Sequence, residues 1–429
     1  MGSKAKTVIT FHSGILTIGG TVIEVSYGDA HIFFDFGTEY RPELGLKDDQ
    51  LSTLLANRLV PELPGVYDPR LGYTYEGTAK QDYQETAVFL SHAHLDHSKM
   101  INYLDPNVPL YTLTETAAIL RSLNRNGDFL IPSPFEAPHF TREMTGLSAG
   151  ETVTIGEIIV TILPVDHDAY GAAALLIHTP DKFLVYTGDL RLHGYDRQLT
   201  LDFCKAAAGC DLLMMEGVSI SFDDREEDPD TMELLSEEDL IQQLVKLVAE
   251  NPKRQLTFNG YPANVKRFAK IIKRAPRTVV LEANQAALLQ EVLGLTVAYY
   301  YLPGAAKIAS LAPELELSLV DLQQDDHQYL WQIVTDFETL QPGSLYFHLD
   351  AQPLGDFDPD YAPFLELLAK LEVTFVRLAC SGHAFPEDLA EIIHLIHPKT
   401  LVPIHTLKPE KLVNPYGERI LPTRGESIS

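Results

Sequence analysis

Long apolar runs are absent from this sequence of 429 residues. No run approaches the ~20 residues that a membrane-spanning helix requires, so the sequence predicts no contact with a membrane. The first residues, MGSKAKTVITFHSG, contain basic side chains but neither an apolar core nor a small-residue cleavage site. This segment therefore does not resemble a secretory signal peptide.

Cysteine is scarce: Cys204, Cys210 and Cys380 are the three in the chain, and none forms a CxxC pair. An odd number without close pairs argues against a disulfide framework and fits a reducing compartment. It also excludes a metal site built from several thiolates. The sequence thus predicts a cytoplasmic protein whose chemistry depends on other side chains.

Basic residues are few relative to acidic ones, 33 against 60, which gives a formal net charge of −27. A charge of this size favours solubility. Taken alone, it argues against a nucleic-acid partner, because the protein repels phosphates at long range. Any such partner has to bind where basic residues are concentrated.

The length of the chain suggests two domains, or one domain with an insertion, and the apolar fraction of 45% is sufficient for a substantial core. The first half alternates β-branched and aromatic residues with glycine breaks, which predicts short strands. Beyond an acidic segment at 223–239, strands alternate with helices expected near 262–274, 284–293 and 360–370, the βαβ pattern of a parallel sheet. We expect a β-rich domain over 1–217, an inserted α/β domain over 218–343, and a return to the first domain over 344–429.

One short loop is crowded with metal-ligand side chains: His92, His94, Asp96 and His97 form the pattern HxHxDH directly after the apolar segment TAVFL. Residues two apart in an extended segment point the same way, so His92 and His94 can converge on one ion. A turn at Leu95 then lets Asp96 and His97 face a second ion. Nitrogen and carboxylate ligands without thiolate suit Zn²⁺ or Mn²⁺. The alternative is a solvated turn with incidental histidines.

Three candidate ligands follow later apolar runs: His167 after ILPV, Asp189 after LVYTG and His405 after LVPI. A single histidine at a strand end is more often a hydrogen-bonded rim residue than a ligand. The order of all three behind HxHxDH favours the ligand interpretation.

These residues resemble a known family. The series Asp35, HxHxDH, His167 and TGD ending at Asp189 is similar to the metallo-β-lactamase superfamily. The later SGHA (381–384) and PIH ending at His405 resemble the β-CASP branch of nucleases, particularly ribonuclease J. The resemblance covers most of the chain. It implies an α/β fold, a four-layer αββα sandwich with an inserted β-CASP-like domain.

The resemblance also implies a dinuclear metal centre, with zinc as the expected ion and manganese as the alternative. Asp35 resembles the buried aspartate that orients metal-site histidines in the family, although a strand-terminating turn aspartate is an equal alternative. One ion would be held by His92, His94 and His167, the other by Asp96, His97 and His405, with Asp189 bridging the two.

Two ions ~3.5–4 Å apart can hold a hydroxide, polarise a phosphoryl oxygen and stabilise an in-line transition state. Asp96 would help orient the hydroxide. The resemblance makes His383 the general acid for the leaving oxygen and Glu216 its acidic partner. The alternative for Glu216 is an ordinary acid at a strand end. Ser381, with the amides of Gly382 and His383, would bind a substrate phosphate.

Basic residues are concentrated in the expected insert: eight lie between Lys253 and Arg277, with no acidic residue among them. Lys266 and Lys270 share one helical face with Lys273 and Arg274. In β-CASP nucleases the insert helps to bind the strand, which makes Lys266 and Lys270 candidate contacts to a single-stranded nucleic acid. The alternative is a solvated helix face that balances nearby acids.

The leading interpretation is a metal-dependent ribonuclease, exonucleolytic or endonucleolytic, that hydrolyses RNA with a hydroxide held by two metals. Single-stranded DNA is not excluded as a substrate, and a homo-oligomer is left open. A second hypothesis keeps the metals but acts on a small phosphodiester or thioester. A third is a non-catalytic scaffold subunit of an RNA-processing complex.

Overall fold

The structure is a computed structural model that describes residues 5–73, 85–127, 129–222 and 231–429. The chain divides into two compact units, each with a hydrophobic core of its own. The first unit comprises Met1–Leu192, Asp196–Asp224 and Gly382–Ser429, and the second comprises His193–Tyr195 and Arg225–Ser381.

The first unit is built on two seven-stranded sheets. In spatial order, the first sheet contains β21 (Ser427–Ile428), β1 (Val8–Ser13), β2 (Val22–Tyr27), β3 (Ala30–Phe34), β4 (Glu85–Phe89), β5 (Leu110–Leu113) and β6 (Thr145–Leu147). The second contains β20 (Glu418–Arg419), β19 (Thr400–Ile404), β11 (Leu212–Glu216), β10 (Phe183–Tyr186), β9 (Ala173–His178), β8 (Ile158–Pro164) and β7 (Thr152–Ile155).

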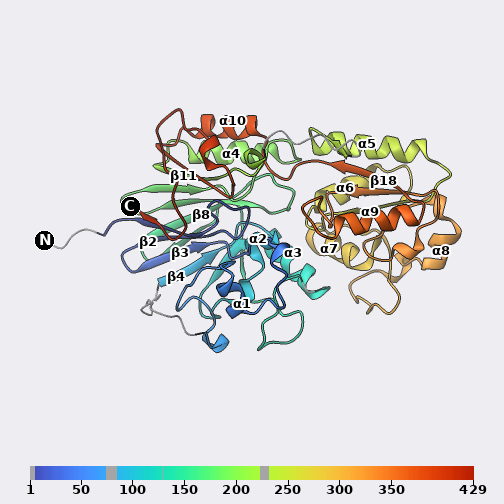
Figure 1. The fold of residues 1–429 in the computed structure, drawn as a ribbon, viewed down its shortest axis with the longest axis horizontal. Helices are drawn as coiled ribbons and strands as arrows, with labels where there is room; N and C mark the ends of the chain where they lie inside the picture. Colours follow the sequence, from blue (N-terminus) through green and yellow to red (C-terminus); the bar gives the residue numbers. More distant parts are fainter. Residues whose placement is uncertain (1–4, 74–84, 128, 223–230) are drawn as a thin grey trace. The chain divides into compact units, whose positions relative to one another are not determined.

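Helices cover the outer faces of both sheets (Figure 1). Beyond the second sheet lie α4 (Arg197–Ala207) and α10 (Pro386–Ile396), and beyond the first lie α1 (Leu51–Ala56), α2 (Leu95–Ser98) and α3 (Thr114–Arg125). The predicted four-layer αββα sandwich is therefore confirmed.

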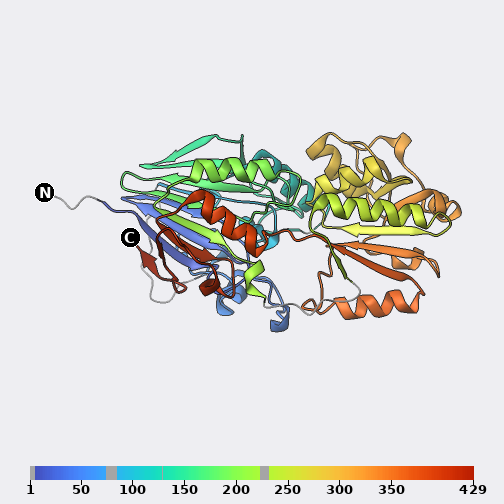
Figure 2. The ribbon, with the colours of Figure 1, turned by 90° about the horizontal axis from the view of Figure 1, so that it is seen from above.

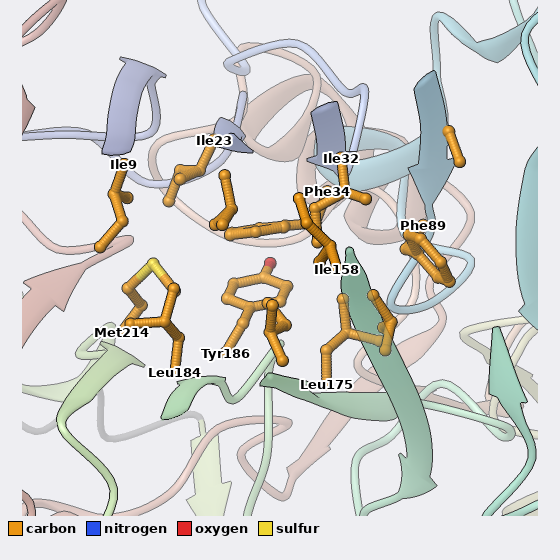
Figure 3. Close-up of a cluster of buried hydrophobic side chains, with 14 of the residues drawn as sticks. Ile9, Ile23, Ile32, Phe34, Phe89, Ile158, Leu175, Leu184, Tyr186 and Met214 are labelled. Atoms are coloured by element: carbon orange, nitrogen blue, oxygen red, sulfur yellow. The ribbon is translucent and has the colours of Figure 1, made fainter. Parts of the chain in front are cut away.

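Alternation along the strands explains why the sheets pack face to face. In β1 every second side chain is buried, as expected for a strand with one face in a core. Figure 3 shows the result: side chains from the first sheet, such as Ile23 and Phe34, point toward Leu175 and Tyr186 from the second. This apolar layer fixes the register of the strands whose ends carry the site.

The second unit contains one parallel sheet with helices on both faces, as the βαβ pattern predicts (Figure 2). In spatial order its strands are β12 (Thr231–Glu233), β18 (Thr374–Ala379), β17 (Leu345–Leu349), β13 (Leu256–Gly260), β16 (Tyr329–Gln332), β14 (Thr278–Glu282) and β15 (Ala298–Tyr300). Its helices are α5 (Glu237–Glu250), α6 (Val265–Arg274), α7 (Ala283–Leu293), α8 (Leu319–Gln324) and α9 (Tyr361–Lys370).

The boundaries of the insert differ from the expected ones. The chain was expected to return to the first domain at residue 344, but β17 pairs with β13 and β18 pairs with β17, all parallel. Both strands therefore belong to the second unit, which ends at Ser381. The physical reason is that β17, α9 and β18 continue the same βαβ pattern, and nothing in their composition marks a change of sheet.

Three other expectations concern the acidic segment, the cysteines and membrane-spanning helices. Residues 223–230 of the expected acidic segment lie outside the described residues. The helix α5 begins soon after them with Ser236 as its N-cap, whose Oγ accepts from the amide of Asp239 at 3.2 Å. All three cysteines are buried and unbridged. Within the described ranges, no helix has the length and apolar character needed to cross a membrane.

Two neighbouring isoleucines of β8 allow a test of which strand face lies in the core between the two sheets. Ile158 is fully buried between the sheets, whereas Ile159 is 41% exposed on the other face. We expect Ile158→Ala to lower the free energy of unfolding by about 2–5 kcal/mol, because it leaves a cavity. Ile159→Ala should change it by less than about 0.5 kcal/mol. Urea unfolding followed by circular dichroism measures both, and equal effects would contradict the assigned faces.

Candidate metal centre

The histidine loop lies where two parallel strands of the first sheet end together. β3 pairs with β4 so that Phe34 faces Phe89, and the amide of Asp35 donates to the carbonyl of Phe89 at 2.9 Å. The chain then runs through His92 into the single turn of α2, which begins at Leu95. Asp35 and the loop therefore leave the same edge of the sheet.

Two glycines allow the loop to pack this closely. A Cβ on Gly37 would lie 1.9 Å from the carbonyl carbon of Asp96, and one on Gly19 would lie 2.5 Å from its Cβ. Gly19 also has a positive φ of 82°. Any side chain at these positions would displace α2 and with it Asp96.

Asp35 is fully buried and accepts hydrogen bonds from several donors of the loop. Its Oδ1 accepts from the amide of Ser91 at 2.7 Å, and its Oδ2 accepts from Nδ1 of His97 at 2.8 Å and from the hydroxyl of Tyr186. Burial together with the Asp35 carboxylate raises the pKa of Tyr186 well above its ordinary value, so the hydroxyl remains a donor. Asp35 thus fixes the ring of His97 with Nε2 turned away from the carboxylate.

A first group of ligand-type atoms comes from the loop, from the segment after β8 and from the end of β10. His92, His94, His167 and Asp189 each present one such atom, all within 4.8 Å of one another. Nε2 of His167 lies 3.2 Å from Nδ1 of His94, and Oδ2 of Asp189 lies 3.6 Å from Nε2 of His92. Ligands with bonds of about 2.1 Å to one tetrahedral ion lie roughly 3.4 Å apart.

A second group lies beside it. Oδ2 of Asp96 is 3.5 Å from Nε2 of both His97 and His405. Oδ2 of Asp189 is 3.2 Å from Nε2 of His97 and 3.8 Å from Nε2 of His405. One oxygen of Asp189 is therefore close to both groups, as a bridging carboxylate has to be.

Parallel pairing explains how the distant segments meet. β10, β11 and β19 are adjacent parallel strands, with Tyr186 opposite Met214 and Glu216 opposite Ile404. Their carboxyl ends deliver Asp189, Glu216 and His405 to one edge of the second sheet. Residues separated by more than two hundred positions become neighbours in this way.

Hydrogen bonds hold the Nδ1 sides of the rings, so that their Nε2 atoms face the centre. Nδ1 of His92 lies 2.9 Å from the hydroxyl of Ser91, and Nδ1 of His167 lies 2.6 Å from the carbonyl of Gly382. Burial lowers the pKa of both rings well below the ordinary value, which keeps them in the neutral form that binds metals.

The centre fits divalent cations. Within the two groups, four buried atoms make no hydrogen bond of regular geometry to any described residue: Nε2 of His92, His97 and His405, and Oδ2 of Asp189. Buried polar atoms without partners are costly, and a cation among them would satisfy all four. Burial alone would lower the pKa of His97, but the carboxylates of Asp189, Asp96 and Asp35 raise it well above its ordinary value. The charges around the centre thus favour a positive charge there.

His383 lies beside the two groups. Its Nδ1 is 3.2 Å from Oε1 of Glu216 and 3.8 Å from Oδ2 of Asp189. Burial alone would lower the pKa of His383, but the carboxylates of Glu216 and Asp189 outweigh it and raise the pKa to about 9. Glu216 is fully buried, and its other oxygen accepts from the amide of Val218 at 2.9 Å. This ring is therefore partnered by a fixed carboxylate.

His405 is supported locally by the two residues that follow it, Thr406 and Leu407. The hydroxyl of Thr406, which is buried, lies 3.0 Å from that of Ser221, and this same serine hydroxyl accepts from the amide of Leu407 at 3.0 Å. The amide of His405 donates to the carbonyl of Gly14 at 3.0 Å. Both sheets thus hold the residue.

The remaining candidate site residues do not all belong to the same unit. Gly382 lies in the first unit beside the centre, where its carbonyl faces His167, whereas Ser381 is exposed and belongs to the second unit. Lys266 and Lys270 lie on α6 in the second unit, with Nζ of Lys270 5.1 Å from the centre of the Tyr195 ring.

The basic face of α6 is smaller than expected from the sequence. Arg267 is fully buried and forms ion pairs with Glu237 at 2.9 Å and Asp350 at 3.0 Å. Arg274 forms an ion pair with Glu238. Two of the basic residues therefore balance acids within the unit instead of facing solvent.

Comparison with known proteins agrees with this geometry. The model of the "Beta-lactamase superfamily domain" family matches residues 73–256. Ribonuclease J of Pyrococcus abyssi (strain GE5 / Orsay) is 22% identical over 426 residues, covering 91% of this chain and 88% of that protein. Ribonuclease J 1 of Streptococcus pyogenes serotype M3 is 21% identical over 416 residues, covering 91% of this chain and 67% of that protein.

These matches support a ribonuclease J-like protein of the β-CASP branch of the metallo-β-lactamase superfamily. The chain is also similar to a crystal structure of a protein of unknown function from Enterococcus faecalis V583. The two share 69% sequence identity with a TM-score of 0.96, and the match covers 99% of both chains.

The superfamily motifs did not reveal every residue that shapes this centre. Asp168 lies directly after His167, and its Oδ1 is 3.3 Å from Nε2 of that histidine. Ser91 and Tyr186 support Asp35. In the sequence, the only indication of their role is that each of them stands directly beside a residue of one of the motifs.

Asp35 provides a test of how the residues of this centre are held together without metal. In the presence of a chelator, Asp35→Ala should lower the free energy of unfolding by at least about 3 kcal/mol, because it leaves several buried donors unpaired. Tyr186→Phe removes one donor and should cost only about 1 kcal/mol. Urea unfolding measures both, and a smaller loss for Asp35→Ala than for Tyr186→Phe would contradict this account.

Proposed function

We propose that the protein is a metal-dependent ribonuclease that hydrolyses phosphodiester bonds of RNA at the centre described above. The observation that carries the proposal is the convergence of imidazoles and carboxylates whose buried Nε2 and Oδ2 atoms lack partners, with His383 and Glu216 beside them. The likeness to ribonuclease J supports RNA as the substrate.

Two divalent ions, zinc or manganese, would supply Lewis acidity at a phosphoryl oxygen and an activated water at neutral pH. The first would be held by His92, His94 and His167, the second by Asp96, His97 and His405, with Asp189 shared between them. Imidazole and carboxylate donors suit either metal.

Side chains of the protein would carry out the proton transfers and bind the substrate phosphate. Asp96 is partly exposed and would accept a hydrogen bond from the attacking water. As the bond from the water oxygen to phosphorus forms, the water loses a proton to Asp96, the ester bond breaks, and the departing oxygen takes a proton from Nε2 of His383. The hydrogen bond from Nδ1 to Glu216 holds the ring in the orientation that presents Nε2. Gly382 and Ser381 would contact the neighbouring phosphate.

The activity is tested with a single-stranded RNA labelled at its 5′ end. We expect cleavage by the metal-loaded protein, loss of cleavage after chelation, and recovery with Mn²⁺ or Zn²⁺. His92→Ala and Asp189→Ala should each lower the rate by at least about 100-fold, because each removes a metal ligand. Mononucleotide release indicates exonucleolytic cleavage, and internal fragments indicate endonucleolytic cleavage.

His383→Ala is the matched variant, because it should lower the rate by about 10²–10⁴-fold while retaining both metals. Unchanged cleavage by the metal-site variants would identify a contaminating nuclease and reject the proposal. Turnover of bis(p-nitrophenyl) phosphate without RNA cleavage would favour a small-molecule hydrolase. A protein that binds no metal and hydrolyses neither substrate would favour a scaffold. A single-stranded DNA of the same sequence tests whether the 2′-hydroxyl matters.

Lys266 and Lys270 are proposed to contact the strand despite the acidic net charge. If both contact phosphates, the double variant Lys266→Ala/Lys270→Ala should reduce the slope of log K against log salt by about 1.4 for single-stranded RNA. Lys205→Ala/Lys399→Ala removes the same charge from exposed positions of the first unit and should leave the slope unchanged. Equal slopes for the two double variants would reject these contacts.

A further inference from the structure

Thr200 places a hydroxyl on the core-facing side of α4, the helix that covers the outer face of the second sheet (Figure 1). The buried residues of α4 are Thr200, Phe203, Cys204 and Ala207, at the spacing of three and four residues that defines one helical face. Thr200 is fully buried. A threonine hydroxyl in a helix can bond to a carbonyl of the preceding turn. This one bonds to two segments outside α4.

The two segments are those that carry His167 and Asp189. The Thr200 hydroxyl accepts from the amide of Asp166 at 2.9 Å and donates to the carbonyl of Arg191 at 3.1 Å. Asp166 directly precedes His167, and Arg191 stands two residues after Asp189. One buried hydroxyl therefore joins the two loops that supply these ligand-type atoms.

The same loops also contact each other directly. The amide of Arg191 donates to the carbonyl of Asp166 at 2.8 Å, and Nε of Arg191 lies 3.6 Å from Oδ1 of Asp166. Both side chains are almost completely buried. These contacts use the amide of one residue and the carbonyl of the other, and Thr200 bonds to the two backbone groups that remain. Without the hydroxyl, both groups would lose this partner inside the protein, and the loops would have to shift to find others.

A shift of these loops would act on the first group of candidate ligands. Nε2 of His167 lies 3.9 Å from Oδ2 of Asp189. Metal–ligand distances are defined to within about 0.2 Å, so a small relative movement of these two atoms is enough to weaken binding. His92 and His94 come from the histidine loop, to which Thr200 makes neither of these two bonds.

Resting on the metal centre of the proposed function, we propose that Thr200 is a positioning residue for the first ion. Its hydroxyl holds the loop of His167 at the separation from Asp189 that the ion requires, and it acts through these loops without touching the ion. The second ion takes Asp96, His97 and His405 from other segments. Only its share of Asp189 depends on Thr200, so the second ion is affected less.

Metal titration of the full chain tests this role without an activity assay. Metal-free protein is titrated with Zn²⁺ or Mn²⁺ in competition with a chromophoric chelator, and we expect the unsubstituted protein to bind two ions. His167→Ala and His405→Ala each remove a ligand of one ion and thereby identify the two positions. Thr200→Val replaces the hydroxyl by a methyl group and should weaken the position that His167→Ala weakens by about 10–100-fold. The other position should change much less.

Conservative and hydroxyl-free variants of Thr200 separate positioning from folding. Thr200→Ser keeps the hydroxyl and should bind both ions as the unsubstituted protein does. Thr200→Ala removes the hydroxyl without adding a methyl group in its place, and should reproduce the loss seen with valine. Circular dichroism and thermal unfolding in chelator show which variants are folded. If neither hydroxyl-free variant folds, Thr200 belongs to the folding core and the assigned role is overturned.

Thr7→Val is the matched control. Thr7 is fully buried in the same unit, and its hydroxyl lies 2.6 Å from that of Thr179 and bonds to the carboxylate of Asp181. These partners precede β10, at the opposite end of that strand from Asp189. Thr7→Val should lower the melting temperature, as Thr200→Val does, but leave both metal affinities unchanged.

The outcomes separate this inference from the proposed function. Unchanged affinities in folded Thr200→Val, or an equal loss in Thr7→Val, would overturn the role of Thr200 and leave the metal centre intact. Equal losses at both positions would overturn the assignment to the first ion. An unsubstituted protein that binds no ion would reject the metal centre, and this inference with it. Metal binding without RNA cleavage would reject the ribonuclease activity and leave the role of Thr200 standing.

Discussion

The buried carboxylate of Asp35 is the interaction on which the rest of the first unit depends. It receives hydrogen bonds from Ser91 and His97 of the histidine loop and from Tyr186 at the end of β10. Asp35 thereby joins the edge of the first sheet to a strand of the second. A carboxylate without these donors would be too costly to bury, and the donors without the carboxylate would be unpaired. Strand pairing, sheet packing and the orientation of His97 are therefore established together.

Orientation of the rings follows the same principle across the centre. Nδ1 of each of His92, His97 and His167 contacts a group supplied by the protein: a hydroxyl, a carboxylate or a backbone carbonyl. Their Nε2 atoms are thus directed before any ion binds, and little conformational freedom remains to be lost on binding. The carbonyl of Gly382 shows that the backbone also takes part. The chain has to return from the second unit at this point for His167 to be fixed.

Much of this arrangement was predictable from sequence because local rules govern it. HxHxDH after an apolar strand, and single ligands at the ends of later strands, follow from the alternation and parallel pairing of strands. The return of the chain at Gly382 was placed too early, because β17 and β18 look the same in sequence whichever sheet they join. The burial of Arg267 was also missed, since helical spacing does not show which side of α6 faces Glu237.

Part of the acidic charge of the chain lies at the metal centre. Asp96, Asp168 and Asp189 lie together around the imidazoles, and Glu216 is buried beside His383, so without cations this edge of the sandwich would repel any phosphate. Two divalent ions would reverse the sign of the field at the point where the chemistry takes place, while the rest of the surface stays acidic. Bound ions would therefore hold a polyanionic substrate most strongly at the atoms that react.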